Sequence, residues 1–191
     1  LKKEKKNFKI KNIKYLFLNL LKLNNLKKIK QNYSFVINCL NLSTNKKIFD
    51  FYLDKGLKNF IHIGSASEYG NGRVPNKESN KSRPISTYGK KKLKDTKYLI
   101  ELFKEKKFPS VIVRVFNPYG NFQTNGVIPY VIYNCKKNKK FILKSSYQTR
   151  DFCHINDICE AVHRILKIDK KEKISGKIFN ISSGKDISIK K

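Results

Sequence analysis

The chain has 191 residues, which is enough for one domain or for one domain and part of another. Hydrophobic residues make up 39% of it, so a wholly disordered chain is excluded. The 43 Lys and Arg residues outnumber the 14 Asp and Glu residues and give a net charge of +29, which first suggests a nucleic-acid partner. The chain contains no Met and begins at Leu1, so we expect a fragment or a decayed copy of a longer protein.

The basic charge consists almost entirely of lysine, because only five of the 43 basic residues are arginines. Surfaces that read nucleic acid rely on the bidentate guanidinium of Arg. Abundant Lys, Asn and Ile are also the residues of A/T-rich codons, so genome composition explains the charge without a polyanionic ligand. We therefore predict no specific nucleic-acid partner and only non-specific attraction of anions at low salt.

The cysteine spacing and the apolar runs bear on location. The four cysteines are Cys39, Cys135, Cys153 and Cys159. They form no C-x-x-C pair and match neither a zinc site nor a disulfide framework, which predicts a reducing cytosol and no metal. Leu1–Asn25 has basic and apolar parts like a signal peptide, but its apolar run is short, is broken by Asn19 and lacks a cleavage site. No apolar run reaches the length of a membrane span, so we predict a cytoplasmic protein without a membrane segment.

Apolar runs and amphipathic stretches alternate along the chain. In order they predict a strand at Ser34–Cys39, a helix at Asn45–Lys55, a strand at Asn59–Ile63, a helix at Thr87–Lys107, a strand at Ser110–Phe116, a helix at Ile155–Ile168 and a strand at Lys177–Ile181. The strand runs lack polar alternation, as is typical of a parallel sheet buried on both faces. The alternation of strands and helices predicts an α/β fold with right-handed crossovers. His62 falls in a buried strand, so we expect a satisfied core residue.

Three segments that carry reactive or small residues lie at strand or helix ends. They are GSASEYG at 64–70 after the second strand, YGKKK at 88–92 at the start of a helix, and RVFNPYG at 114–120 after the third strand. In an open α/β sheet the carboxyl ends of the strands face the ligand crevice. The three segments therefore predict a site at that edge of the sheet.

Tyr88 and Lys92 are four residues apart, so a helix places both on one face. A Lys ammonium beside a phenol favours the phenolate, and such a Tyr can take a proton from an alcohol or return it to a ketone. Ser65 is placed to hydrogen-bond the same oxygen. The spacing alone is weak evidence in so lysine-rich a chain, because Tyr133 and Lys137 repeat it. We interpret Tyr133, which lies in an amphipathic stretch, as a packing residue.

The order of these blocks resembles the extended short-chain dehydrogenase/reductases, and within them the NAD-dependent epimerase/dehydratase family that acts on nucleotide sugars. The similar blocks are GSASEYG, P-x-x-E, P-x-x-x-YGKKK, RVFNPYG, RDFCHINDICEAV at 150–162 and FNISSG at 179–184. They occur in the family's order from about Ser34 to the C-terminus. The resemblance implies a Rossmann-like doubly wound parallel sheet at 1–116. It also implies part of a small substrate-binding domain at 117–191, with elements that return to the sheet.

The resemblance also implies roles for individual residues on the cofactor side. Tyr88, Lys92 and Ser65 would form the catalytic set, with Tyr88 as the base. Lys92 would also hold the nicotinamide ribose of NAD, and NADP is not excluded. Phe116 falls where the family packs an aromatic ring beside the nicotinamide, and Asn41 falls in a cofactor-contact loop.

On the substrate side, the resemblance implies that a nucleotide-diphosphate sugar contacts Ser65, Asn117, Val127 and Arg150. Arg150 would pair with the diphosphate, a role that suits a bidentate guanidinium. The alternative for Arg150 is a surface ion pair with Asp151.

The chain departs from the family pattern in several places. It contains no G-x-x-G-x-x-G, the turn that places a pyrophosphate on a helix N-terminus, so we expect the first strand and its Gly-rich turn to be missing. Leu18–Leu20 stands where the family often has an Asp-Leu pair near the adenine. Asn41–Thr44 follows its strand at once, so the cofactor-contact loop looks deleted or degenerate. The chain ends soon after Asp186–Ser188, where more of the substrate domain is expected.

Several functions remain open at this point. The first is a UDP-glucose 4-epimerase-like enzyme, expected as a homodimer through the helix Tyr88–Lys107. A nucleotide 4-keto-6-deoxysugar reductase shares every motif. A dehydratase is disfavoured because Ala66 and Ser67 stand where that subgroup has an acid pair. The alternatives of another class are a basic nucleic-acid-binding protein and a non-catalytic remnant.

Overall fold

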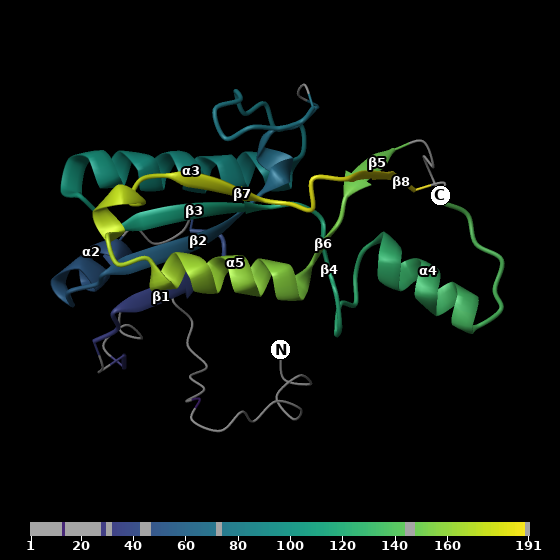
Figure 1. The fold of residues 1–191 in the computed structure, drawn as a ribbon, viewed down its shortest axis with the longest axis horizontal. Coiled ribbons are helices and arrows are strands. Elements are labelled where there is room, and N and C mark those ends of the chain that lie inside the picture. Colours follow the sequence, from purple (N-terminus) through teal and green to yellow (C-terminus); the bar gives the residue numbers. More distant parts are fainter. Residues whose placement is uncertain are drawn as a thin grey trace.

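The computed structural model describes residues 13, 28–29, 32–42, 47–71, 74–143 and 148–189. Its central feature is a parallel sheet with the strand order β1-β2-β3-β7 (Figure 1). The strands are β1 (Phe35–Asn38), β2 (Asn59–Ser65), β3 (Ser110–Val115) and β7 (Ile178–Ile181). Each neighbouring pair runs parallel, which confirms the α/β fold class.

The described helices are α2 (Lys47–Asp54), α3 (Thr87–Lys106), α4 (Val127–Lys136) and α5 (Ile155–Lys167), with short 3-10 turns η2 (Ala66–Glu68) and η3 (Lys171–Lys173). Three of the described helices, α2, α3 and α5, lie where the sequence predicted them, whereas α4 was not predicted as a helix. The longest, α3, begins where the Ser86 side chain accepts a hydrogen bond from the Gly89 amide at 3.0 Å. It ends at Lys107, whose left-handed φ of 54° turns the chain toward β3.

The two faces of the sheet are covered by different helices, and Figure 1 shows α3 and α5 on opposite sides of the strands. One face packs on α2 and α3 through a partly aromatic core made of Phe49, Leu57, Phe60, Leu99, Leu102, Phe108 and Ile112. The other face packs on α5 through an aliphatic core that includes Ile61, Val111, Val113, Ile158, Val162 and Ile165. Successive residues of β2 and β3 point to opposite faces, so both faces are buried, as the unbroken apolar runs predicted.

Strand β1 is less buried than predicted. Among the described strands it lies at one edge of the sheet, paired with β2 alone. Phe35 and Ile37, which point to the α5 side, are 42% and 48% exposed because α5 packs over β2, β3 and β7 instead. The prediction of a fully buried strand is therefore wrong for β1, and in β7 only Ile181 is buried.

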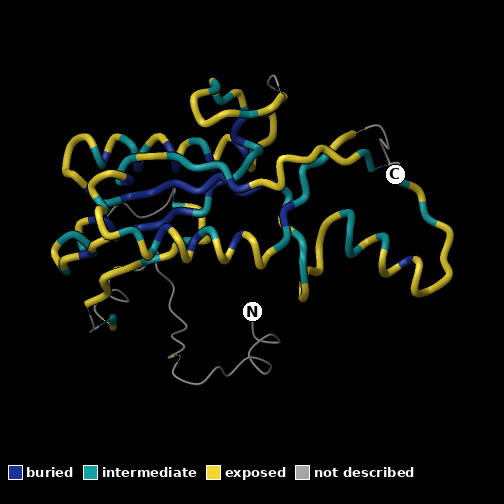
Figure 2. The backbone as a smooth tube through the Cα atoms, viewed as in Figure 1, coloured by how far each residue is buried: buried dark blue, intermediate teal, exposed yellow. Residues whose placement is uncertain are grey.

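Two small sheets extend the fold beyond the carboxyl ends of β3 and β7 (Figure 1). Strand β4 (Pro118–Tyr119) pairs parallel with β6 (Cys153–His154), and β5 (Thr149–Asp151) pairs antiparallel with β8 (Asp186–Ser188). Figure 2 shows the buried residues concentrated in the central strands, whereas the α4 region is mostly exposed or intermediate. The residues after β3 and after β7 therefore meet at one end of the main sheet.

Three findings concern membrane helices, cysteines and metal ligands. Within the described ranges, no helix combines the length and the apolar character needed to cross a bilayer. All four cysteines are free thiols, and Cys153 is the buried one. Among the described residues, no group of three His, Cys, Asp or Glu side chains is arranged to hold a metal ion.

Candidate active site

A cavity of about 830 Å³ lies at the carboxyl ends of β2 and β3. We call it the strand-end cavity. Five of the residues singled out in the sequence line it: Ser65, Tyr88, Phe116, Asn117 and Arg150. They come from β2, α3, the end of β3 and β5, so the fold brings together segments that are far apart in the chain. This is the edge of the sheet at which the motif positions predicted a site.

Ser65 is held at the point where β2 ends. Its backbone is extended, and its side chain caps η2 by accepting hydrogen bonds from the Ser67 amide at 3.2 Å and the Ser67 hydroxyl at 2.8 Å. The cap fixes the Ser65 hydroxyl relative to the strand, so its position follows from the backbone of the turn.

Tyr88 is the second residue of α3, and its side chain is 51% exposed in the strand-end cavity. The helix start approaches η2 closely because residue 89 is glycine. A Cβ atom there would lie 2.4 Å from the Ser67 carbonyl oxygen, which no side chain allows. Gly89 therefore permits the contact that brings Tyr88 and Ser65 to the same cavity.

Lys92 lies one turn further along α3, but its side chain takes another direction. It is 4% exposed, and its ammonium donates to the Ile63 carbonyl oxygen at 2.8 Å rather than lining the cavity. Burial lowers the pKa of this ammonium, while the nearby carboxylates of Asp95 and Glu68 act in the opposite direction. The shared helix face predicted from the spacing is present, yet the ammonium lies behind the end of β2.

A second cavity, of about 470 Å³, lies between α5 and the face of the sheet formed by β1, β2 and β3. We call it the α5 groove. The strands contribute Ile37, Ile63 and Val115, and the helix contributes Ile158, Val162 and Leu166. Ser65, Tyr88, Val115 and Pro118 line both cavities, so the Ser65–Tyr88 pair stands where a polar space meets an apolar one.

These two spaces test whether the residues present fit a nicotinamide cofactor. The apolar walls of the α5 groove suit a flat heteroaromatic ring beside Tyr88, so the reacting end of such a cofactor fits. The nine glycines of the chain form no G-x-x-G-x-x-G, so they offer no pyrophosphate turn of that kind. The fit therefore concerns the nicotinamide end.

Arg150 lines the strand-end cavity from β5. Its guanidinium donates to the Thr149 carbonyl oxygen at 2.8 Å and to the Gln148 side chain, both exposed contacts with the two residues that precede it. The ion pair with Asp151 is not formed. The Asp151 carboxylate instead accepts three hydrogen bonds from the turn after β7, at 2.7 to 3.0 Å, from Ser183 and Gly184. Arg150 is thus a cation at the cavity wall, and Asp151 ties β5 to that turn.

Phe116 and Asn117 form the corner after β3. Phe116 is 9% exposed, and its ring centroid lies 6.3 Å from that of Tyr69. The Asn117 amide donates to the Asp151 carbonyl oxygen at 2.9 Å, which links the corner to β5. Both residues therefore reach the cavity from a backbone that is fixed on two sides.

The structure leaves two other predicted site residues outside the strand-end cavity. Asn41 is exposed after β1 and lines neither that cavity nor the α5 groove. Val127 opens α4 and lines a separate cavity of about 1120 Å³. Leu18–Leu20, predicted near the adenine, and Ser43–Thr44 lie outside the described residues.

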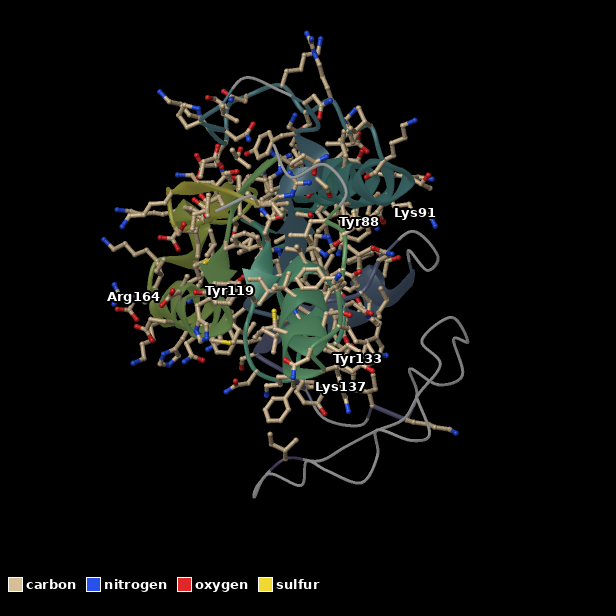
Figure 3. The ribbon with its side chains drawn as sticks, turned by 90° about the vertical axis from the view of Figure 1, so that its right-hand side faces the viewer. Tyr88, Lys91, Tyr119, Tyr133, Lys137 and Arg164 are labelled. Carbon is tan, nitrogen blue, oxygen red and sulfur yellow. The ribbon has the colours of Figure 1, made fainter. Side chains whose placement is uncertain are left out.

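The second Tyr–Lys pair differs from the first in its surroundings. Tyr133 lies on α4, and Lys137 caps the end of that helix. Figure 3 shows this pair at α4, away from Tyr88 at the start of α3. Tyr133 is 57% exposed, so its interpretation as a packing residue is wrong. Few other elements lie beside α4, because α4 lies beyond the end of the main sheet (Figure 1).

His62 is fully buried but only half satisfied. The Asn38 amide donates to its Nδ1 at 2.9 Å, so the neutral ring carries its proton on Nε2, which has no hydrogen-bond partner among the described residues. The prediction of a satisfied core histidine is therefore wrong for Nε2. Burial, with a smaller effect from the Lys92 charge, lowers the pKa of His62 to about 3.

Sequence reasoning missed a buried ion pair beside the site. Glu68 Oε2 lies 2.9 Å from Arg114 Nε, and the two side chains are 0% and 3% exposed. The available signal was chemical: Arg114 interrupts an apolar strand, and a buried cation needs a counter-charge. The partner was not predictable, because the two residues are 46 positions apart and meet only in the folded sheet.

The chain is similar in sequence to a known protein family. The family model described as NAD dependent epimerase/dehydratase family matches residues 6–182. The dTDP-4-dehydro-6-deoxyglucose reductase of Escherichia coli is 31% identical over 160 residues, covering 80% of this chain and 49% of the relative. The ADP-L-glycero-D-manno-heptose-6-epimerase of Brachyspira hyodysenteriae is 32% identical over 166 residues, covering 82% and 48%. The chain spans about half the length of these curated relatives.

Solved structures show the same fold. The UDP-glucuronic acid 4-epimerase of Bacillus cereus, in complex with UDP-glucuronic acid and NAD, is similar with a TM-score of 0.72 and 26% identity. The match covers 86% of this chain and 59% of that one. The Rossmann-like sheet is therefore shared with enzymes whose chains extend beyond the part matched here.

Proposed function

Because this chain belongs to the NAD-dependent epimerase/dehydratase family, we propose that it carries the reacting centre of a nucleotide-sugar 4-epimerase of the UDP-glucose type. One observation carries the proposal. The Ser65–Tyr88 pair lies where the strand-end cavity, which holds the Arg150 cation, meets the apolar α5 groove. A polar anionic substrate on one side and a nicotinamide ring on the other would meet at this pair.

The chemistry at the pair is the transfer of a proton. Tyr88 Oη takes the proton from the C4 hydroxyl of the sugar and later returns it to the ketone oxygen. Ser65 hydrogen-bonds the same sugar oxygen and keeps it in reach of the phenol. NAD, or NADP, bound along the α5 groove supplies a ring that accepts a hydride and gives it back.

Lys92 and Asn41 are proposed contacts on the cofactor side. An ammonium has three donors, and the Ile63 carbonyl needs only one of them, so Lys92 can also serve a ribose hydroxyl at the end of β2. Asn41 follows β1 beside this position, and the Asp95 carboxylate fixes the adjoining Leu42 amide at 2.9 Å. That bond supports a defined loop at the end of β1.

Arg150 and Asn117 are proposed contacts on the substrate side, with Phe116 as an apolar wall near the nicotinamide. The hydrogen bonds of the Arg150 guanidinium to Thr149 and Gln148 are exposed, and a diphosphate can replace them by bidentate charge-assisted bonds. Val127 is proposed to approach the nucleotide from α4. The UDP group is thereby anchored while the sugar lies near Tyr88.

Reduction of a 4-keto-6-deoxysugar nucleotide is the second candidate. The similarity to the Escherichia coli reductase favours it. Tyr88 would transfer a proton at the C4 oxygen in the reductase reaction as in the epimerase reaction. The reductase consumes one NADPH per product, whereas the epimerase regenerates its cofactor.

The wider assignments belong to the same proposal. We propose that residues 1–116 belong to the cofactor-binding domain and 117–191 to the substrate-binding domain. The free thiols suit a reducing cytoplasm. The assembly is proposed to be a homodimer through α3.

The test compares two Tyr→Phe variants of the full chain. Purified protein is incubated with UDP-glucose and NAD, and UDP-galactose is measured. We expect Tyr88→Phe to lower the rate at least about a hundredfold, whereas Tyr133→Phe, a matched change outside the strand-end cavity, leaves it unchanged. Equal rates for wild type and Tyr88→Phe would contradict the proposal. Stoichiometric NADPH consumption with a 4-keto-6-deoxysugar nucleotide, and none of the epimer, would establish the reductase instead.

A further inference from the structure

We infer that Glu68 is a positioning residue for Ser65 and that Arg114 holds Glu68 in that role; the inference rests on the proposed function. Glu68 does not line the strand-end cavity, so it acts through Ser65. Its carboxylate makes two different bonds. One oxygen accepts the Ser65 amide at 3.0 Å, and the other accepts the Arg114 Nε–H at 2.9 Å.

The bond to the Ser65 amide fixes the turn that carries the reactive hydroxyl. Ser65 caps η2 with its side chain, and Glu68, at the third position of the turn, caps Ser65 with its own, so the two form a capping box. The hydrogen bonds from Ser67 to the Ser65 hydroxyl depend on the same turn. Releasing the carboxylate would therefore free both the backbone and the hydroxyl of Ser65.

Gly64 provides the space for this carboxylate. A Cβ atom on residue 64 would lie 2.7 Å from Glu68 Oε1 and 3.3 Å from the Ile112 side chain. The glycine before Ser65 thus admits the carboxylate against the strand. Gly64, Ser65 and Glu68 are linked by contact as well as by sequence order.

Arg114 connects the same carboxylate to the segment 74–86, part of which lines the strand-end cavity. Its Nη2 donates to the Ser82 hydroxyl at 3.0 Å, and its guanidinium lies 4.5 Å from the centre of the Tyr69 ring. Tyr69 donates to Asn180 at 2.8 Å, and Asn180 donates to the Asn76 carbonyl at 3.0 Å. One ion pair therefore aligns the serine side of the cavity with the segment 74–86.

A buried ion pair is a poor device for stability alone. Desolvation of both charges offsets their attraction, and apolar residues of the same volume often stabilise a core as well or better. The bridging geometry is what apolar residues lack, because they have no oxygen that accepts hydrogen bonds from an amide and a guanidinium. Orientation of Ser65 accounts for the pair where stability does not.

The first test measures the Ser65 amide directly. Hydrogen exchange is followed by NMR in the isotope-labelled full chain. We expect Glu68→Ala to speed exchange of the Ser65 amide about tenfold or more, because its acceptor is lost. Glu68→Gln keeps an oxygen acceptor and should restore most of the protection. Asp50→Asn, which removes the exposed partner of Lys106, is the matched control and should change nothing at Ser65.

The second test separates kcat from KM in the epimerase assay, with rates referred to the folded fraction. We expect Glu68→Ala to lower kcat about a hundredfold, since a displaced Ser65 misorients the sugar oxygen. KM should change little because Arg150 and Asn117 are untouched. A purely structural role predicts fewer folded molecules with an unchanged kcat each.

The outcomes separate this inference from the proposed function. Unchanged Ser65 exchange in every Glu68 variant overturns the inference, whatever the turnover. A wild-type chain without epimerase activity overturns the proposed function alone, and amide exchange then still decides the role of Glu68. Glu68→Asp retains the charge opposite Arg114 but is too short to bridge both groups, so it provides the same test if the alanine variant does not fold.

Discussion

On the α2–α3 face of the sheet, aromatic rings fill the space between strands and helices, whereas on the α5 face an apolar groove remains open beside β1. The rings of Phe49, Phe60 and Phe108 stand 5.2 to 5.6 Å apart in edge and tilted contacts. The α5 face is built mainly from aliphatic side chains, and Ile37 at its edge is 48% exposed. Close packing on one face holds the strand ends in place, and incomplete cover on the other leaves room beside Ser65 and Tyr88.

The largest expected effect comes from truncating a buried side chain on the α2–α3 face. Phe60→Ala removes a ring that is 2% exposed, and we expect it to lower the free energy of unfolding by about 3–5 kcal/mol. Ile37→Ala, the matched truncation at the open face, should cost less than about 1 kcal/mol because half of its surface is already in water. Urea unfolding followed by circular dichroism measures both. An equal loss at Ile37 would contradict an open groove.

The next effect depends on pH, and it also arises on the α2–α3 face. His62 titrates at about 3 in the folded chain and near 6.5 when unfolded. Its pKa is depressed, so between these values the unfolded state binds a proton that the folded state does not. Stability should fall by about 1.4 kcal/mol per pH unit below 6.5, or about 2 kcal/mol at pH 5, and above 6.5 His62 contributes no pH dependence.

Urea midpoints at pH 7.5 and pH 5.0 measure this dependence. His62→Gln should flatten it. His163→Gln is the matched control, because the His163 side chain is 55% exposed, and should leave the dependence as in wild type. An unchanged slope in His62→Gln would show that other groups set the acid sensitivity.

The contrast between the faces also shows what the sequence could predict. The sheet was predictable because β2, β3 and β7 are runs of mainly apolar residues, and β2 and β3 are buried almost throughout. The partial exposure of β1 was not predictable. Its composition matches that of a central strand, and its exposure depends on which elements lie beside it. The prediction for Tyr133 was wrong for the same reason, because an amphipathic pattern predicts a packed face but does not identify the element that packs on it.

The site divides in a similar way. Ser65, Tyr88, Asn117 and Arg150, which line one cavity, were predicted to lie together because each stands in a motif at a strand or helix end. The direction of Lys92 was not predictable, because a long side chain can reach either the cavity or the Ile63 carbonyl from one Cα position. Contacts between distant positions, such as Glu68 with Arg114, require the sheet register.

A smaller effect, about tenfold in rate, tests whether the groove on the open face receives a nicotinamide cofactor. Cys39 and Cys159 line the α5 groove, and Cys135 is exposed on α4. We expect NADH at ten times its Kd to slow alkylation of Cys39 and Cys159 about tenfold and to leave Cys135 unchanged. Cys153 should react slowest throughout, because burial raises the pKa of its thiol. Peptide mass spectrometry after timed alkylation gives each rate, and equal protection at Cys135 would contradict binding in the groove.

The smallest expected effect concerns the outer side of the packed face, where α3 turns Lys90, Lys91, Lys94 and Lys97 to solvent. A homodimer through α3 places the same residues on both sides of a two-fold axis, so these lysines repel one another. Salt screens that repulsion, and the dimer Kd should fall about threefold between 50 and 500 mM salt. Sedimentation equilibrium measures the Kd, and a Lys94→Gln variant should dimerise more tightly at low salt than a Lys136→Gln control on α4.

Nucleic-acid binding should depend on salt in the opposite direction, since the release of counterions makes it weaken as salt rises. An assembly that dissociates as salt rises, together with oligonucleotide binding that Tyr88→Phe does not alter, would favour the nucleic-acid alternative over the dimeric enzyme.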